Sequence, residues 1–101
     1  MAITKSKLDF LYDIDIDEGS IIWKNPSKNH PYLLGKEAGT TIYDTRTESG
    51  MRKPYRTLII DGKAYKKGRL LFFYHHGRWP TPCVDHINGN SLDDRITNLR
   101  S

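Results

Sequence analysis

An aspartate and a histidine stand side by side at positions 85 and 86, directly before the turn-forming residues Asn88-Gly89-Asn90. A neutral imidazole can accept a proton from water near neutral pH, and a carboxylate is a hard oxygen ligand for a small divalent cation. Neighbouring side chains on a strand point to opposite faces, so Asp85 and His86 need a bulge or a strand end to act on one phosphate. The turn supplies that end. A surface histidine beside an acid is common, so the pair gains meaning only from the residues around it.

Residues 84–100 read VDHINGNSLDDRITNLR. This string resembles the phage and intron-encoded HNH endonucleases, in the subgroup whose motif begins Asp-His-Ile-Asn-Gly-Asn and ends in Asn-Leu-Arg. The upstream chain is similar too, and the resemblance covers roughly residues 8 to 101. The matching residues are Asp85, His86, Ile87, Asn88, Gly89, Asn90, Arg95, Ile96, Asn98, Leu99 and Arg100, preceded by Gly39-Thr40, Ile60-Asp61-Gly62-Lys63, Arg69-Leu70 and Gly77-Arg78-Trp79-Pro80.

The resemblance implies a ββα-metal nuclease site that hydrolyses DNA phosphodiesters. In it, His86 is the general base for the attacking water, and Asp85 is the first ligand of one divalent cation, Mg²⁺ or Mn²⁺. Asn98, in the middle position of the motif, braces the loop between the two strands, while Asn88 and Asn90 shape the turn.

Four departures from the family pattern limit what the resemblance implies for this chain. The sequence stops at Ser101, before the helix that carries the family's final His or Asn ligand, so the resemblance implies a C-terminally truncated motif with an incomplete metal site. Gly68 stands where relatives commonly have a histidine, and Asp94 stands where they usually have asparagine. The polar segment at residues 44–54 is also longer than in typical relatives. Catalysis by the chain as it stands is therefore an open question.

The elements that must position these residues form an α+β fold: a small antiparallel β-meander with a packed helix, followed by a partial ββα-metal motif. Asp61-Gly62 predicts a tight turn between two strands, because glycine tolerates positive φ. Gly77 lies where a helix C-cap belongs. The predicted elements are helices at 6–12 and 67–76, strands at 20–23, 39–43, 55–60 and 63–65, and loops at 25–31 and 44–54.

We predict two parts of the chain, a DNA-positioning meander and helix at residues 1–80 and the first half of the HNH motif at residues 81–101. A motif cut in half leaves Ile87, Ile96 and Leu99 in need of apolar partners. We expect these side chains to rest on the helix of the meander or on a second copy of the chain.

Charge is distributed unevenly between the two halves. Residues 1–50 hold 6 basic and 8 acidic residues, a net charge of −2, whereas residues 51–101 hold 10 and 4, a net charge of +6. Such an excess favours a polyanion, here double-stranded DNA, although a solvated basic face with no partner is the alternative. The residues predicted to contact DNA are Arg52, Lys53, Arg56, Lys66, Lys67, Arg69, Arg78, Arg95 and Arg100.

Other classes of protein are disfavoured. The longest apolar run is too short to span a bilayer, and the N-terminus has no secretory signal, so we expect a cytoplasmic protein, of a bacterial host if phage-encoded. The single cysteine, Cys83, excludes an internal disulfide and a zinc ribbon. Two alternatives to an HNH endonuclease or nickase, possibly of the homing type, stay open: a non-catalytic DNA-binding remnant, and a phage protein that binds a host protein.

Overall fold

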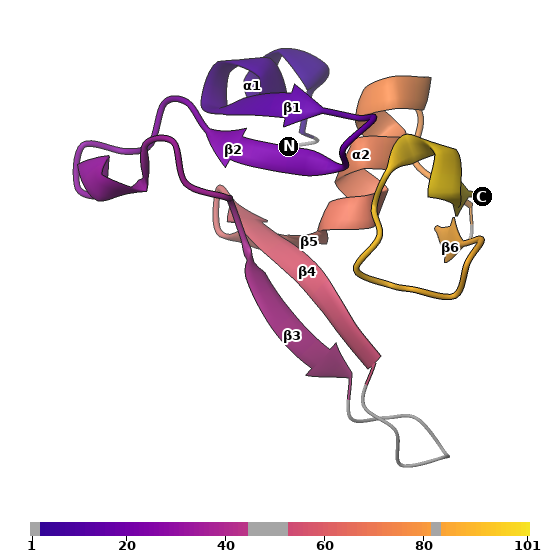
Figure 1. Cartoon of the computed structure of the whole chain (residues 1–101). Helices are drawn as coiled ribbons and strands as arrows, with labels where there is room; N and C mark the ends of the chain where they lie inside the picture. The colour runs from indigo at the N-terminus through magenta and orange to yellow at the C-terminus, as the bar shows by residue number, and fades with distance from the viewer. Residues whose placement is uncertain (1–2, 45–52, 82–83) are drawn as a thin grey trace.

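The computed structural model describes residues 3–44, 53–81 and 84–101 (Figure 1). Two α-helices and seven short strands are connected by loops and two 3₁₀ turns. In chain order they are α1 (Lys5–Leu11), β1 (Tyr12–Asp15), β2 (Ser20–Trp23), η1 (Pro31–Leu33), β3 (Thr40–Asp44), β4 (Lys53–Ile60), β5 (Lys63–Lys66), α2 (Lys67–His76), β6 (Asp85–His86), η2 (Ile96–Asn98) and β7 (Leu99–Arg100). This arrangement confirms the predicted α+β class.

The first part of the chain folds into α1 and an antiparallel hairpin of β1 and β2. The Thr4 hydroxyl caps α1 by accepting a hydrogen bond from the Lys7 amide at 3.2 Å. Tyr12 was predicted to end this helix, but it is extended and begins β1, a strand that the sequence reading missed. Tyr12 is buried and packs its ring against Trp23 at a centroid distance of 4.7 Å. Burial of this aromatic side chain outweighs one further helical residue.

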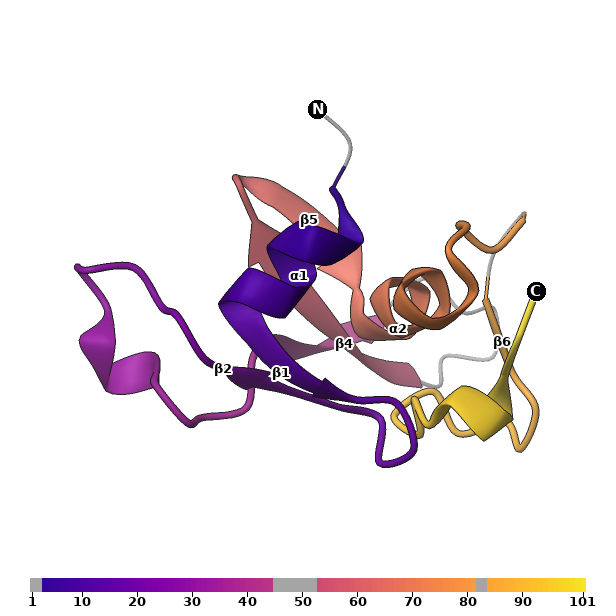
Figure 2. The same cartoon turned by 90° about the horizontal axis from the view of Figure 1, so that it is seen from above.

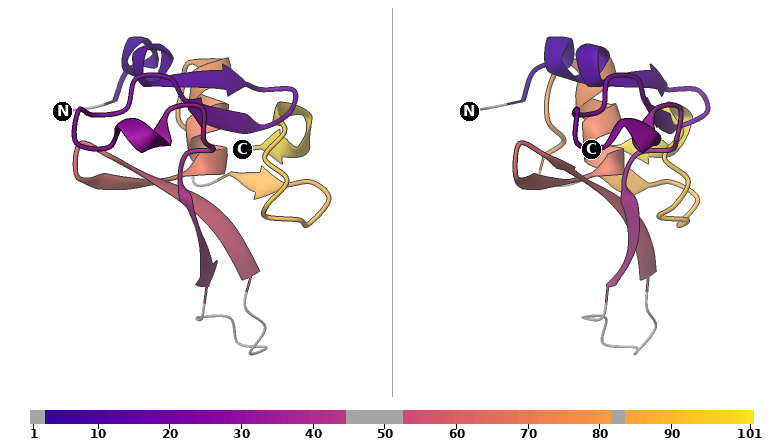
Figure 3. Two further views of the ribbon diagram at one scale, coloured as in Figure 1. Left: turned by 60° about the vertical axis from the view of Figure 1, so that its left-hand side comes forward. Right: turned by 90° about the vertical axis from the view of Figure 1, so that its left-hand side faces the viewer.

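Strands β3, β4 and β5 form the predicted antiparallel meander. Asp61 and Gly62 both have positive φ, 53° and 78°, which is the conformation that an Asp-Gly hairpin turn adopts. The β3–β4 hairpin extends away from the rest of the fold, as two side views show (Figure 3). The predicted loop at 44–54 is shorter at both ends, because Asp44 and Lys53 pair in the ladder; residues 45–52 lie outside the described part.

Helix α2 has the predicted bounds, and Gly77 ends it in the left-handed conformation with φ of 74°. The helix packs against β4 and β5 through the fully buried side chains of Leu70, Leu71 and Phe72. Seen from above, α2 lies between α1 and the segment that carries β6 (Figure 2). Helix α2 therefore lies between the first helix of the chain and its C-terminal segment.

The C-terminal segment joins this core rather than standing apart from it. Leu99 is 6% exposed and belongs to the same apolar cluster as Leu8 and Leu70, and Ile96 packs on that cluster. The expectation that these residues rest on the helix is confirmed, whereas Ile87 remains 54% exposed. Ile96 also donates its amide hydrogen to the carbonyl of Ile16 at 2.9 Å, which ties η2 to the β1–β2 turn. None of the helices in the described part is long and apolar enough to cross a membrane.

Candidate active site

The short β6–β7 ladder sets the positions of Asp85 and His86. Asp85 pairs in register with Arg100, and His86 pairs with Leu99. The two neighbouring side chains have different partners. The exposed Asp85 carboxylate accepts a hydrogen bond from Arg100 Nε at 2.8 Å, whereas His86 Nε2 lies 2.7 Å from Asp94 Oδ1. Asp85 thus faces solvent and His86 faces inward, as expected for successive residues of a strand.

Asp94 is the most buried ionisable group of this site. Its side chain is 2% exposed and that of His86 is 16% exposed. Burial raises the pKa of the Asp94 carboxyl, while its hydrogen bond to His86 and the positive charges of His86 and Lys67 act in the opposite direction. Lys67 is itself buried and lies 3.6 Å from Glu37. Charged groups therefore extend from the exposed Glu37 through the buried Lys67 to the Asp94–His86 pair.

Because Gly68 has no side chain, there is room beside α2 for the His86–Asp94 pair. A Cβ atom built on Gly68 would lie 2.9 Å from Asp94 Oδ1, 3.4 Å from Val84 Cγ1 and 3.5 Å from His86 Nε2. Glycine in a helix interior costs about 0.5–1 kcal/mol relative to alanine. The close approach of the carboxylate and the imidazole to the backbone of α2 accounts for glycine at this position.

A network of side-chain hydrogen bonds fixes the loop between β6 and β7. The buried Asn98 accepts from the Asn88 amide at 3.0 Å, and its own amide group donates to Asn88 Oδ1 at 3.0 Å and to the Asp93 carbonyl at 2.8 Å. Asn88 and Asn90 each accept from the backbone amide two residues on, at 2.8 and 3.1 Å. These are Asx turns, which set the course of residues 88–92. The Ser91 hydroxyl donates to the Pro54 carbonyl and connects the loop to β4.

Replacing Asn98 with alanine is expected to destabilise the protein by about 1–2 kcal/mol, because three part-buried hydrogen bonds of a buried side chain are lost. Asn90→Ala in the same loop removes one exposed local bond, from the Leu92 amide to Asn90 Oδ1, and should cost only about 0.5 kcal/mol. Urea denaturation of the two variants beside the wild type measures both values. Equal destabilisation by the two changes would contradict a bracing role for Asn98.

The Asp93 carboxyl makes the contribution of this loop to stability depend on pH. Hydrogen bonds from Arg95 and from the Asn88 amide hold the pKa of the Asp93 carboxyl well below its usual range. The folded state therefore binds this proton less readily than the unfolded state. The resulting stabilisation is present above the ordinary pKa of aspartate, about 4, and is lost as the pH falls through the lower folded value.

We expect Asp93→Asn to reduce stability at pH 7 and to reduce it less at pH 3. Urea unfolding midpoints of wild type and variant at pH 7, 5 and 3 check this expectation. The two midpoints should converge as the pH falls. A gap of constant size across the series would show that Asp93 acts through shape rather than charge.

Several of the predicted DNA contacts have hydrogen-bond or ion-pair partners within the protein, among them Arg56, Lys67, Arg95 and Arg100. Arg56 donates to Thr41 Oγ1 at 3.1 Å and to the carbonyls of Ala38 and Gly39 at 3.0 and 2.9 Å, so its guanidinium ties β4 to β3. The internal contacts of Arg56 and of the buried Lys67 favour structural roles for these two residues over contact with DNA. Arg95 bonds both carboxylate oxygens of Asp93 and Arg100 bonds Asp85, yet both arginines remain exposed.

The other predicted cations have different positions. Lys66 and Arg78 are exposed at the two ends of α2, where they lie over the rings of Tyr55 and Phe72. Arg69 is half-buried and lies 5.8 Å from the centroid of the Trp79 ring. Arg52 and the side chain of Lys53 are outside the described part of the chain. Among the predicted DNA contacts in the described residues, the exposed cations therefore lie at the two ends of α2 and on the β6–β7 motif.

Asp85 has the donor chemistry that a hard divalent cation requires. Mg²⁺ is commonly held by one or two carboxylates together with substrate phosphates and water. Within residues 3–44, 53–81 and 84–101, no group of three or more His, Cys, Asp or Glu side chains is placed to hold a metal ion. Of the two residues that form β6, the exposed Asp85 is thus the one that carries oxygen donors of the kind such a cation prefers.

The similarity to known proteins lies in the segment of the chain that carries this site. Residues 65–101 match a family described as HNH endonuclease. The match begins in β5 and includes α2, β6, η2 and β7. It confirms the predicted HNH resemblance for these residues and supports a nuclease-type function with DNA as the substrate. No curated protein and no solved structure gives a significant match.

Sequence reasoning missed two residues of this site. Asp94 and Gly68 were recognised only as departures from the family pattern, yet they contact His86 or approach it closely. The sequence offered one signal for these two residues, which is that both depart from the family pattern in the same chain. An acid at position 94 and the missing side chain at position 68 are complementary, because the carboxylate occupies space that any larger residue on the helix would fill.

Proposed function

We propose that this chain is an HNH-type DNA endonuclease or nickase in which His86 is the general base. The observation that carries the proposal is the His86–Asp94 pair at 2.7 Å, held between β6 and α2 in the segment that matches HNH endonucleases. A histidine with one ring nitrogen bonded to a buried carboxylate is oriented and kept in one tautomer. This is the arrangement that proton abstraction from water requires.

The direction of proton transfer follows from the donor and acceptor roles in the pair. Above the raised pKa of Asp94, its carboxylate can only accept a hydrogen bond, so His86 Nε2 carries the hydrogen. Nδ1 then has the free lone pair and is the atom that takes a proton from the attacking water. As His86 becomes an imidazolium, the Asp94 carboxylate stabilises its charge. Asp94 acts through His86 and is therefore a positioning residue.

Asp85 is the residue we assign to a divalent cation, Mg²⁺ or Mn²⁺. When bound, such a cation neutralises charge that develops on the phosphate and on the leaving oxygen. Arg100 lies against the same carboxylate and keeps it in place on the β6–β7 ladder. Being exposed, Arg100 is also free to turn toward a phosphate of the substrate.

The proposal also assigns different roles to the two parts of the chain. Residues 1–80 position DNA and residues 81–101 carry the chemistry, with Gly68 of α2 as the point at which the two parts meet. Phosphate contacts fix the register of a protein on DNA, and we assign them to Lys66, Arg69, Arg78, Arg95 and Arg100. The Asp85–Asn90 hexapeptide supports an origin in the phage and intron-encoded subgroup.

Nicking of a supercoiled plasmid by the purified chain tests the proposal. The protein is incubated with Mg²⁺ or Mn²⁺, and a parallel reaction contains EDTA. We expect conversion of supercoiled to open-circular DNA only with the cation. Persistence of nicking in EDTA would contradict the assigned role of Asp85, and binding of the plasmid without any cutting would contradict the enzymatic proposal.

A second candidate function is a DNA-binding module without catalysis. It is favoured because no three His, Cys, Asp or Glu side chains of the described residues are grouped so that they could hold a metal ion. This candidate predicts a gel shift without cutting. Affinity should then fall with salt by roughly 0.9 logarithmic units per phosphate contact and decade of salt.

A further inference from the structure

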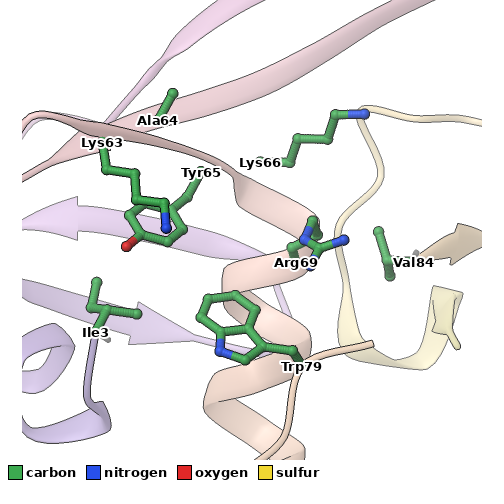
Figure 4. Close-up of a pocket in the computed structure, with 8 residues that line it drawn as sticks. All are labelled: Ile3, Lys63, Ala64, Tyr65, Lys66, Arg69, Trp79 and Val84. Atoms are coloured by element: carbon green, nitrogen blue, oxygen red, sulfur yellow. The ribbon is translucent and has the colours of Figure 1, made fainter. Parts of the chain in front are cut away.

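A cleft of about 490 Å³ opens beside α2, between β5 and the segments that flank the helix (Figure 4). It is large enough for a small ligand, since binding pockets commonly measure about 300–1,000 Å³. Eight of the described residues line it, and none of these eight is acidic. Those that give the cleft its chemistry are Lys63, Tyr65, Lys66, Arg69, Trp79 and Val84.

One wall of the cleft is aromatic. Trp79 stacks on Phe73 with a centroid distance of 4.4 Å and an angle of 10° between the ring planes. Tyr65 lies 5.9 Å from Trp79 and is nearly parallel to it, at 12°. Both rings are half-buried, so part of each remains open to a ligand. Flat, partly exposed rings of this kind bind nucleobases regardless of sequence, at about 1–3 kcal/mol per base.

The cleft is also lined by three cations. Lys63 lies 5.7 Å from the centroid of the Tyr65 ring, and Arg69 lies 5.8 Å from that of Trp79. Lys66, like Lys63, is exposed. An apolar peptide is a poor ligand for this cleft, because it has no negative charge to pair with the three cations. A ligand with a flat ring and a phosphate satisfies both kinds of lining residue.

The cleft is next to the candidate active site. Gly68 and Arg69 are consecutive residues of α2: Gly68 closely approaches Asp94 and His86, and Arg69 lines the cleft. Val84 borders both places, since it lines the cleft and its Cγ1 lies 3.4 Å from the position of a Gly68 Cβ. Asp85 follows Val84 directly. A nucleotide in the cleft thus has its neighbouring phosphodiester in the direction of His86.

We propose that the cleft binds one unpaired nucleotide of the DNA strand, with its base against Tyr65 and Trp79 and its phosphate at Lys63, Lys66 and Arg69. The inference rests on the proposed function, because it takes the substrate to be DNA. It adds that the strand is held through a base that has left the duplex. The protein should consequently prefer single-stranded or gapped DNA to an intact duplex of the same length.

The test compares two double variants that remove the same charge. Lys63→Ala/Lys66→Ala changes the cleft, and Lys28→Ala/Lys36→Ala removes two exposed lysines from the connection between β2 and β3. The probe is a fluorescein-labelled eight-nucleotide oligothymidylate, measured by anisotropy over a range of salt. We expect the cleft variant to bind about 10-fold more weakly, with a salt slope reduced by about 1.4 for two lost contacts, and the control to change less than about 3-fold.

A second measurement does not depend on a substitution within the cleft. The chain has two tryptophans, and Trp23 packs on Tyr12 in the β1–β2 hairpin. In a Trp23→Phe variant, emission therefore comes from Trp79 alone, and oligothymidylate should quench it. Equal weakening by both double variants, or no quenching at saturation, would overturn the cleft proposal and leave DNA as the substrate. Failure of the wild type to bind either single-stranded or duplex DNA would overturn the proposed function itself.

Discussion

His86→Ala is expected to lower plasmid nicking by about 10²–10⁴-fold, the usual contribution of a general base. DNA affinity should be unchanged, because the His86 side chain is only 16% exposed and its ring bonds Asp94. Initial rates of nicking and a gel-shift titration measure the two quantities on the same preparation. His75→Ala is the matched control, since it removes an exposed histidine from the last turn of α2. The control should nick at the wild-type rate.

Two results would contradict this assignment. If the His86→Ala variant nicks DNA at the wild-type rate, His86 is not the base. If nicking and DNA affinity fall together by the same factor, His86 contributes to binding rather than to chemistry. A thermal unfolding curve of the variant separates both cases from simple loss of structure.

Gly68→Ala is expected to destabilise the protein, although alanine is the better helix former. Helix propensity alone favours alanine by at most about 0.5–1 kcal/mol, the value for a helix interior, because Gly68 is the second residue of α2. The added methyl group would lie 2.9 Å from Asp94 Oδ1, and that carboxylate is buried and bonded to His86, so it has little room to move. Overpacking of this kind costs about 1–3 kcal/mol. We expect a net loss of stability in urea denaturation and a nicking rate at least about 10-fold lower.

A double-mutant cycle identifies the cause. In an Asp94→Ala background the carboxylate is gone, so the effect of Gly68→Ala should change sign and stabilise the protein by at most the helix-interior value of about 0.5–1 kcal/mol. His75→Ala, on an exposed face of the same helix, should have an equal effect in both backgrounds. A Gly68→Ala penalty that survives removal of the Asp94 carboxylate would show that the clash is with Val84 or the backbone instead.

Elements with a local cause could be predicted from the sequence. Helix α2 has its expected bounds because an apolar run ends at a glycine that adopts the left-handed conformation, and the β4–β5 turn depends only on Asp61 and Gly62. The family motif likewise located Asp85 and His86 within one short segment. In each case the decisive residues are neighbours in the sequence.

Features that depend on distant contacts could not be predicted in this way. Strand β1 forms because Tyr12 packs on Trp23, and Arg56 turns inward because the carbonyls of Ala38 and Gly39 are within reach. The pairing of His86 with Asp94 beside Gly68 requires α2 and the β6–β7 loop to be placed together. Composition and residue spacing reveal the net charge and the periodicity of apolar residues. They do not show which carbonyl or carboxylate group a basic side chain will contact in the folded protein.

The close contact between the β1–β2 turn and η2 has a consequence for synthesis on the ribosome. Gly19, with φ of 68°, allows the turn to approach the backbone at Asp94 and Arg95, where a Cβ would lie 2.6 Å from the Arg95 nitrogen. One side of this contact emerges from the ribosome long before the other. His86 thus gains its fixed orientation only after Asp94 has left the exit tunnel. Until then, a nascent chain is expected to be inert toward the DNA of the cell that makes it.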